Sequence, residues 1–165
     1  MFGQEQDDII WPSAVELIPR GLVDPNFGWA TTSVSAVPEP PAGDFDADGD
    51  VDGDDVDFYV GSLDQPATGE LAQLDLDGDG EVTIADFNLH VTTLVVTSNG
   101  VTGALLGDVN LDGVVDVLKD GFTLVGSLGQ SATSRSQGDL NADGLVDVLN
   151  DAFILINDLG QSNAL

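Results

Sequence analysis

The chain has 165 residues, of which 42% are hydrophobic; this excludes a fully disordered tail and leaves room for one domain or two small ones. Its 30 acidic residues stand against only 3 basic ones (Arg20, Lys119 and Arg135), and the formal net charge of -27 argues against nucleic acid and anionic membrane surfaces as partners. The absence of Cys excludes disulfides and thiolate metal sites.

The first region, residues 1–43, differs in composition from the rest. Its apolar stretch is too short to enclose a core, and the Pro-rich segment "SVSAVPEPPAG" that follows favours an extended linker. We therefore expect an extended arm that packs on the rest of the chain or on another chain. Its large apolar residues are Ile9, Ile10, Trp11, Leu17, Ile18, Leu22, Val23, Phe27 and Trp29. The chain start lacks the basic residues and apolar core of a signal peptide, so we expect either a protein that is not secreted or a processed piece.

The remainder of the chain is a repeat. "GDVNLDGVVDVLKDGFTLVGSLGQS" at 107–131 recurs as "GDLNADGLVDVLNDAFILINDLGQS" at 138–162, with 16 of 25 positions identical at an offset of 31. Two more acidic segments, which begin at Asp44 and Asp75, share the pattern D-x-[DN]-x-D-G-x-V at the same offset. The chain therefore carries four acidic loops, and "VVTSNGVTG" marks a break between two pairs. We predict one pair at 44–97 and the other at 98–165.

Each acidic loop fits the spacing of a calcium-binding loop. Oxygen ligands in such a loop stand at positions 1, 3, 5, 7, 9 and 12, position 7 supplies a backbone carbonyl, and Gly at position 6 makes a sharp turn. Loop one (44–55) thus offers Asp44, Asp46, Asp48, Asp50, Asp52 and Asp55. Loop two (75–86) offers Asp75, Asp77, Asp79, Glu81, Thr83 and Asp86. We expect the position-8 residues Val51, Val82, Val115 and Val146 to join the two loops of each pair through a short strand.

Loops three (108–120) and four (139–151) carry Lys119 and Asn150 at position 12, where a lysine would oppose a dication. The apolar stripe after these loops ends one residue later than after loops one and two. We infer a one-residue insertion, so that position 13 supplies the closing carboxylate while Lys119 and Asn150 point to solvent. The predicted ligands are Asp108, Asn110, Asp112, Val114, Asp116 and Asp120 in loop three, and Asp139, Asn141, Asp143, Leu145, Asp147 and Asp151 in loop four.

Apolar residues after each loop recur at helical spacing, as on the core-facing side of an amphipathic helix. In the first pair these stripes are Val56, Tyr59, Val60 and Leu63, and Phe87, Val91 and Leu94. In the second pair they are Phe122, Val125 and Leu128, and Phe153, Ile156 and Leu159. The predicted fold class is mainly α, with four calcium loop-helix units in two pairs behind the extended arm.

Calcium is the favoured ion for these loops. A single acidic turn is often a solvated spacer, but four copies that each end in an acid at a helix start indicate metal ligands. Magnesium prefers octahedral geometry and keeps its waters, and zinc prefers His or Cys. The sequence therefore predicts four calcium sites.

The units open with "GDVNLDGVVD" or "GDLNADGLVD" and lack an entering helix, because "EPPAG" and "SATSRSQG" are poor helix formers. In these features residues 43–162 resemble two tandem dockerin type I modules, which occur in secreted bacterial proteins. The resemblance implies an extracellular, calcium-dependent fold that docks to a protein partner, the cohesin domain, through loop positions 10 and 11 and basic helix residues. Here the basic positions are empty, and loops three and four have Val117 with Leu118 and Val148 with Leu149 at positions 10 and 11. Burial of these four residues and their exposure as an apolar patch are equal alternatives.

Two binding functions fit this pattern. In the first, which we favour, a calcium-stabilised structural protein assembles with copies of itself into a filament or surface structure through its arm. In the second, an attachment module of a larger secreted protein binds a cohesin-like receptor. Catalysis is not expected, because the carboxylates stand at ligand spacing and His90 fits a partly exposed structural residue. An intracellular calcium sensor would have entering helices and a Met-rich groove.

Overall fold

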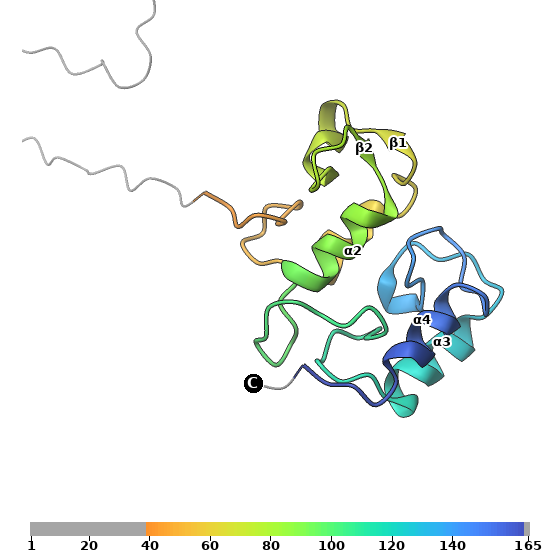
Figure 1. Ribbon diagram of the computed structural model, residues 1–165. Helices are drawn as coiled ribbons and strands as arrows, with labels where there is room; N and C mark the ends of the chain where they lie inside the picture. The colour runs from red at the N-terminus through yellow and green to blue at the C-terminus, as the bar shows by residue number, and fades with distance from the viewer. Residues whose placement is uncertain (1–38, 164–165) are drawn as a thin grey trace, which may run out of the picture. The chain divides into compact units, whose positions relative to one another are not determined.

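The computed structural model describes residues 39–163, which are drawn in colour in Figure 1. The chain divides after Val37 into two units, and the described residues belong to the second, Pro38–Leu165. Most of the predicted arm, including the apolar residues from Ile9 to Trp29, lies outside the described residues. Its docking to another chain therefore stays a prediction.

The first half of the described chain, residues 39–104, contains one longer helix and several short elements. In chain order these are α1 (Gly53–Val56), η1 (Asp57–Tyr59), β1 (Gln65–Pro66), η2 (Gly69–Leu74), β2 (Glu81–Val82) and α2 (Ile84–Thr93). The two strands pair antiparallel, with Gln65 opposite Val82. A capping box starts α2, because the Thr83 hydroxyl accepts from the Ala85 N–H and the Asp86 carboxylate accepts from the Thr83 N–H.

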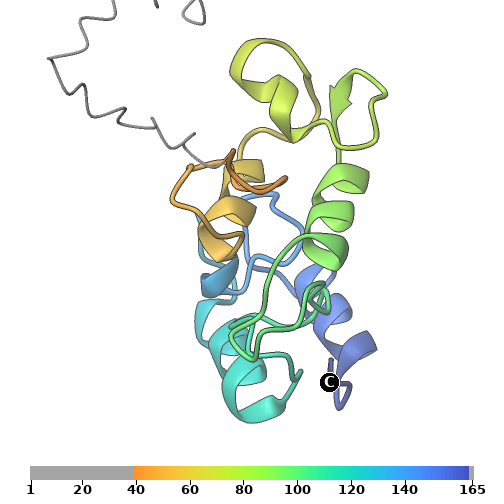
Figure 2. The ribbon, with the colours of Figure 1, turned by 90° about the vertical axis from the view of Figure 1, so that its left-hand side faces the viewer.

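The second half, residues 105–163, contains two α-helices, one after each of its two acidic loops. Its elements are η3 (Val117–Gly121), α3 (Phe122–Ser127), η4 (Arg135–Gln137) and α4 (Asp151–Asp158). The turn η3 is π-helical and runs directly into α3. Figures 1 and 2 show α3 (cyan) and α4 (blue) in this half and α2 (green) in the other.

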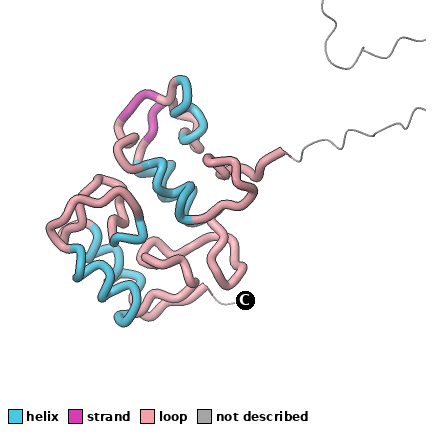
Figure 3. Tube along the Cα trace, turned by 180° about the vertical axis from the view of Figure 1, so that it is seen from behind, coloured by secondary structure: helices cyan, strands magenta, loops and turns pink. Residues whose placement is uncertain are grey.

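Short helices joined by long loops make up most of the described chain (Figure 3). This composition fits the predicted mainly helical class, although the helix after loop one is shorter than expected, since α1 has 4 residues before it continues as η1. Single 3-10 elements, η2 and η4, precede loops two and four. Within residues 39–163, every helix is too short or too polar to cross a membrane.

The first core confirms the helical stripes predicted for the first pair. Val56, Tyr59, Phe87 and Val91 are each at most 1% exposed. They pack in one cluster with the two position-8 residues of this half, and the Tyr59 hydroxyl donates to the Leu74 carbonyl at 3.1 Å. Burial of a side chain of this size contributes about 1.5–3 kcal/mol to the free energy of unfolding, so these residues fix the helices on their loops.

The stripes predicted for the second pair are wrong except at Leu128, which packs against the second core. Phe122 and Phe153 are 63% and 74% exposed, whereas Leu124 and Leu155 are buried at 2% and 6%. Phe122 and Phe153 stand two residues after their closing acids, whereas Val56 and Phe87 stand one residue after theirs, so the two aromatic rings of the second half face away from the core. Each helix is anchored by its closing acid, and the residue four positions after that acid faces the core in all four units. These core-facing residues are Tyr59, His90, Leu124 and Leu155.

The four position-8 valines are buried but do not join the two loops of a pair to each other. Each one instead exchanges backbone hydrogen bonds with the segment that follows the helix of the other loop. The Val96 N–H donates to the Val51 carbonyl and the Asp64 N–H donates to the Val82 carbonyl, both at 2.8 Å. The second half repeats this arrangement, since Val115 bonds with Gly160 and Gln161, and Val146 bonds with Gly129 and Gln130. These reciprocal hydrogen bonds join the two loops of each half, together with the helices that follow them.

Candidate metal centre

The four acidic loops share one backbone conformation. At position 6, Gly49, Gly80, Gly113 and Gly144 all have positive φ, between 85° and 107°. At position 4, Ala47, Gly78, Leu111 and Ala142 also have positive φ, between 53° and 78°. A non-glycine residue rarely adopts this left-handed region, so three such residues at one position show that the loop imposes the turn. The sequence motif marked position 6 but gave no signal at position 4.

The side chains at positions 1, 3 and 5 turn inward in the same way in each loop. The position-6 N–H donates to the position-1 carboxylate, as in Gly49 to Asp44 Oδ2 at 3.0 Å and Gly144 to Asp139 Oδ2 at 2.9 Å. The position-5 N–H donates to the position-3 side chain, and the position-7 N–H donates to the position-5 carboxylate. These contacts are found in all four loops. The loop backbone thus holds its carboxylates around a common centre.

The closing acids occupy equivalent places in all four loops. Asp55 Oδ1 accepts from the N–H groups of Phe45 and Asp46, while its Oδ2 accepts from the N–H of Asp52. Asp86 and Asp120 make the same three contacts in their loops, and Asp151 makes two of them. The structure therefore places Asp120 and Asp151, at position 13, where Asp55 and Asp86 stand at position 12.

A π-helical turn accommodates the extra residue of loops three and four. The Gly121 N–H donates to the Asp116 carbonyl and the Ala152 N–H to the Asp147 carbonyl, each at 3.1 Å and across five residues. In loops one and two the matching bonds span four residues, from Val56 to Asp52 and from Phe87 to Thr83. Such π-bulges are the usual way for a helix to absorb an insertion, and they often occur at functional sites.

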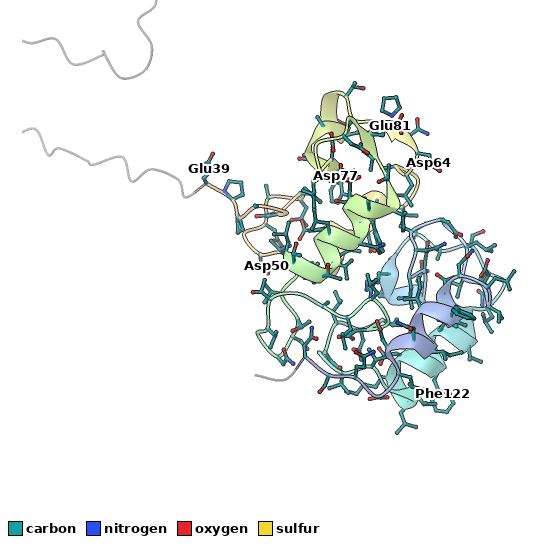
Figure 4. All side chains as sticks on the ribbon, in the orientation of Figure 1. Glu39, Asp50, Asp64, Asp77, Glu81 and Phe122 are labelled. Atoms are coloured by element: carbon teal, nitrogen blue, oxygen red, sulfur yellow. The ribbon has the colours of Figure 1, made fainter. Side chains whose placement is uncertain are left out.

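Loops one and two gather the densest negative charge. Three groups of carboxylates offer oxygen atoms that lie within 4.8 Å of one another: Asp44 with Asp46 and Asp48, Asp50 with Asp52 and Asp55, and Asp75 with Asp77 and Asp86. Figure 4 labels Asp50 and Asp77, one from each of these loops. Like charges at such distances repel by about 1 kcal/mol per pair even in water, so a counter-charge is needed to hold them.

Two buried oxygen atoms, one in loop one and one in loop four, are evidence for a cation-binding site at the centre of these loops. Asp44 Oδ1 and Asp139 Oδ1 are shielded from solvent and accept no hydrogen bond from the described residues. Each belongs to the position-1 carboxylate, whose other oxygen is held by the position-6 N–H. A buried oxygen without a partner costs about 1–3 kcal/mol, and a bound cation removes that cost. The donor set of carboxylates, amide oxygens and backbone carbonyls fits calcium.

Burial is the main reason that the pKa of the carboxyls of Asp57, Asp108 and Asp139 is raised to about 6 in each case. Neighbouring acids, including Asp120 beside Asp108 and Asp151 beside Asp139, raise the pKa further. Calcium binds only the ionised carboxylate, so protons would compete with a calcium ion held by Asp108 or Asp139.

These shifts predict opposite pH dependences with and without calcium. Between about pH 4 and pH 6 the folded chain holds protons that the unfolded carboxyls, with pKa near 3.8, have released. In excess EDTA the free energy of unfolding therefore falls as the pH rises through this window, and melting should occur at higher temperature at pH 5 than at pH 7. With saturating calcium the order should reverse, because protons displace the ion. Thermal melting followed by circular dichroism tests both pH dependences. A lower melting temperature at pH 5 than at pH 7 in EDTA would contradict the raised pKa values of these buried carboxyls.

We expected Lys119 to point to solvent, but the structure shows that it does not do so freely. Its side chain is 58% exposed, but the ammonium pairs with the carboxylate of Asp112, a predicted ligand. Asn150 is turned the same way, since its Nδ2 donates to Asp147 Oδ2 at 3.2 Å and lies 3.5 Å from Asp143 Oδ2. The π-helical turn brings position 12 back over the loop, and this contact is not visible from spacing alone.

Two residues at the boundary between the halves carried no signal in the sequence. Arg135 is 2% exposed and its guanidinium donates to the carbonyl oxygens of Leu105, Leu106 and Asp108, at 2.6 to 3.2 Å. Its backbone N–H donates to Asp57 Oδ1 of the first half at 2.7 Å. Asp57 is thus half-buried, and Arg135 ties the first half to the start of loop three.

His90, expected to be partly exposed, is fully buried. Its Nε2 lies 3.1 Å from the Gly43 carbonyl, and its ring stacks at a tilt against Phe45 with centroids 4.8 Å apart. Burial lowers the pKa of the imidazole. The contact fixes the residue that precedes loop one, so His90 supports the loop from the core.

The comparisons with known proteins give one partial likeness. No protein-family model matches the chain. No curated protein matches it either. Among solved structures, the chain is similar to the type II cohesin-dockerin domain from Bacteroides cellolosolvens, with 34% sequence identity over 37% of this chain and 93% of that chain, at a TM-score of 0.32.

Proposed function

We propose that the chain is a non-catalytic calcium-binding protein in which each of the four loops holds one ion. The observation that carries this proposal is the pair of buried oxygen atoms on Asp44 and Asp139 that have no hydrogen-bond partner within residues 39–163, each at position 1 of a loop lined by carboxylates. In each loop the side chains at positions 1, 3, 5 and 9, the carbonyl at position 7 and the closing acid would hold the ion. When bound, calcium neutralises the repelling carboxylates and fixes the loop to its helix.

Isothermal titration calorimetry with calcium tests the proposal and the shifted register together. Asp120→Ala should remove one binding site, because Asp120 closes loop three and also accepts three backbone N–H bonds. Lys119→Ala, one residue away, should leave the number of sites unchanged. A variant pair with the reverse result would show that position 12 closes loop three. A full chain that takes up no calcium would refute the proposed function.

An exposed apolar face in the second half supports a role in protein-protein attachment. Val117, Leu118, Val148 and Leu149 are between 53% and 83% exposed, which is against burial at positions 10 and 11 and supports the apolar patch. The neighbouring residues Phe122, Val125, Phe153 and Ile156 are also 63% to 74% exposed. Figure 4 shows Phe122 on the outer side of α3. We name these eight residues the apolar face, and we infer that they form one interaction site, because soluble proteins rarely expose so many apolar side chains together.

The charge around the apolar face sets the chemistry of its partner. Asp112, Asp116, Asp143 and Asp147 come from the loops that carry the face, and Lys119 is the one exposed Lys or Arg of residues 39–163. Each of these loops has four Asp against the two charges of one calcium ion, so a net negative charge remains beside the apolar face when calcium is bound. A partner with an apolar centre and a rim of Lys and Arg would complement it. We propose that this chain is a calcium-dependent attachment module, in two pairs at 44–97 and 98–165, that acts outside the cell on a cohesin-like protein. Self-assembly through the arm has less support, because the arm lies outside the described residues.

A purified type II cohesin domain is a suitable probe for this attachment. Surface plasmon resonance should detect binding to the full chain in calcium and not in EDTA. The double variant Phe122→Ser with Phe153→Ser should weaken binding by at least about tenfold, because buried aromatic residues dominate such interfaces. Leu89→Ser, which changes an exposed residue on α2, is the matched control. Binding that the double variant leaves intact would show that another surface makes the contact, and no binding in calcium would exclude this class of partner.

A further inference from the structure

The two Lys or Arg side chains of the described chain both lie at loop three. Lys119 pairs with the position-5 carboxylate, Asp112. Arg135 approaches from the other side, where its Nε and Nη2 donate to the carbonyl oxygen of Asp108, the position-1 residue, at 3.2 and 3.1 Å. Within residues 39–163, loops one, two and four have no hydrogen bond from a Lys or Arg side chain to a predicted ligand.

Loop four is a natural control for the Lys119 contact, because it carries the same ligand set and the charge of Arg135 acts on its Asp139 as well as on Asp108 of loop three. Asp, Asn, Asp, Asp and a closing Asp stand at the same positions of both loops, and both contain the π-helical turn. Position 12 differs: the neutral amide of Asn150 takes the place of the Lys119 ammonium and contacts the corresponding carboxylate.

The position-1 carboxylates also differ between these two loops. In loop three both oxygens of Asp108 accept hydrogen bonds, from the N–H of Asp112 at 3.2 Å and of Gly113 at 2.7 Å. In loop four Asp139 Oδ1 is buried without a partner among the described residues. Loop three is therefore satisfied by the protein itself to a greater extent than loop four.

We propose that Lys119 and Arg135 partly take the place of the metal at loop three, so that this loop binds calcium last and most weakly of the four. The proposal rests on the calcium-binding function. A dication that enters loop three meets two fixed positive charges and must displace the Lys119 ammonium from Asp112. Repulsion of this kind near the surface, with salt present, corresponds to a loss of about three- to tenfold in affinity relative to loop four.

Each loop contains its own reporter for the test. The position-6 N–H donates to the position-1 carboxylate, so the amide resonances of Gly49, Gly80, Gly113 and Gly144 should respond to the ion in their own loop. Titration of the full, isotope-labelled chain with calcium chloride, followed by heteronuclear NMR, gives a midpoint for each glycine. We expect the Gly113 midpoint at the highest calcium concentration, about three- to tenfold above that of Gly144.

A reciprocal exchange at position 12 tests the cause. Lys119→Asn should lower the Gly113 midpoint toward that of Gly144, and Asn150→Lys should raise the Gly144 midpoint. Both positions are exposed, so neither change should disturb the fold. Midpoints for Gly113 and Gly144 that coincide in the parent chain, or that do not move in the exchanged variants, would overturn the proposal while leaving calcium binding intact. If none of the four glycines responds to calcium, the proposed function itself fails.

Discussion

Excess EDTA should lower the melting temperature of the full chain by more than about 20 °C. At a free calcium concentration 100 times the dissociation constant, each site adds about 2.7 kcal/mol to the free energy of unfolding, and four sites add on the order of 11. An ordinary domain has a total stability of 5–15 kcal/mol. Loops one and two contain three clusters of carboxylates, and the oxygens within each cluster lie within 4.8 Å of one another. Without the ion, the carboxylates of each cluster would also repel one another. Differential scanning calorimetry with and without EDTA measures the effect.

Addition of calcium above the EDTA concentration should restore the melting temperature, whereas the same concentration of magnesium should restore it only in part. Magnesium keeps its water ligands and fits a flexible cage of protein oxygens poorly. A melting temperature that EDTA leaves unchanged would show that calcium is not part of the fold.

Arg135→Met should reduce the free energy of unfolding by about 3–5 kcal/mol, the usual cost of removing one partner from a buried charged network. Methionine fills a similar volume but leaves the carbonyl oxygens of Leu105, Leu106 and Asp108 without their donor. The charge of Arg135 also offsets the buried carboxyls of Asp57 and Asp108. Urea unfolding in saturating calcium measures the loss.

Lys119→Met is the matched control for this experiment, because it removes the other described basic side chain. Lys119 is exposed and its ion pair with Asp112 lies at the surface, so the urea midpoint should change little. Equal effects of the two substitutions would mean that Arg135 acts only through net charge. Arg135→Lys should fall between the parent chain and Arg135→Met, because an ammonium cannot donate to three carbonyls in the geometry of a guanidinium.

The spacing of residues in the loops was enough to predict much of the candidate site. Ligand spacing is local, since a loop of 12 or 13 residues closes on itself through hydrogen bonds between neighbours. The insertion in loops three and four was also readable, because the repeat showed it as a shift of one residue. The structure places Asp120 and Asp151 in line with Asp55 and Asp86, although their role as ligands stays a prediction.

The helix faces of the second half show where a pattern misleads. Phe122 and Phe153 stand at helical spacing from other apolar residues, and the sequence could not tell a core stripe from an exposed one. The closing acid sets the rotation of the helix, and it turns Leu124 and Leu155 to the core. Counting four residues on from that acid would have identified these two core positions, because the same offset buries Tyr59 and His90 in the first half.

The sequence by itself determined the four acidic loops, their pairing in the chain and the oxygen-rich chemistry that favours calcium, because all of these depend on residues within one repeat. Only the tertiary structure decided which apolar residues are exposed, how each Val at position 8 is paired, and where the two basic side chains lie. Arg135 is 27 residues from Asp108 and 78 from Asp57 along the chain, and no local spacing links them. Their contact exists because the two halves fold against each other.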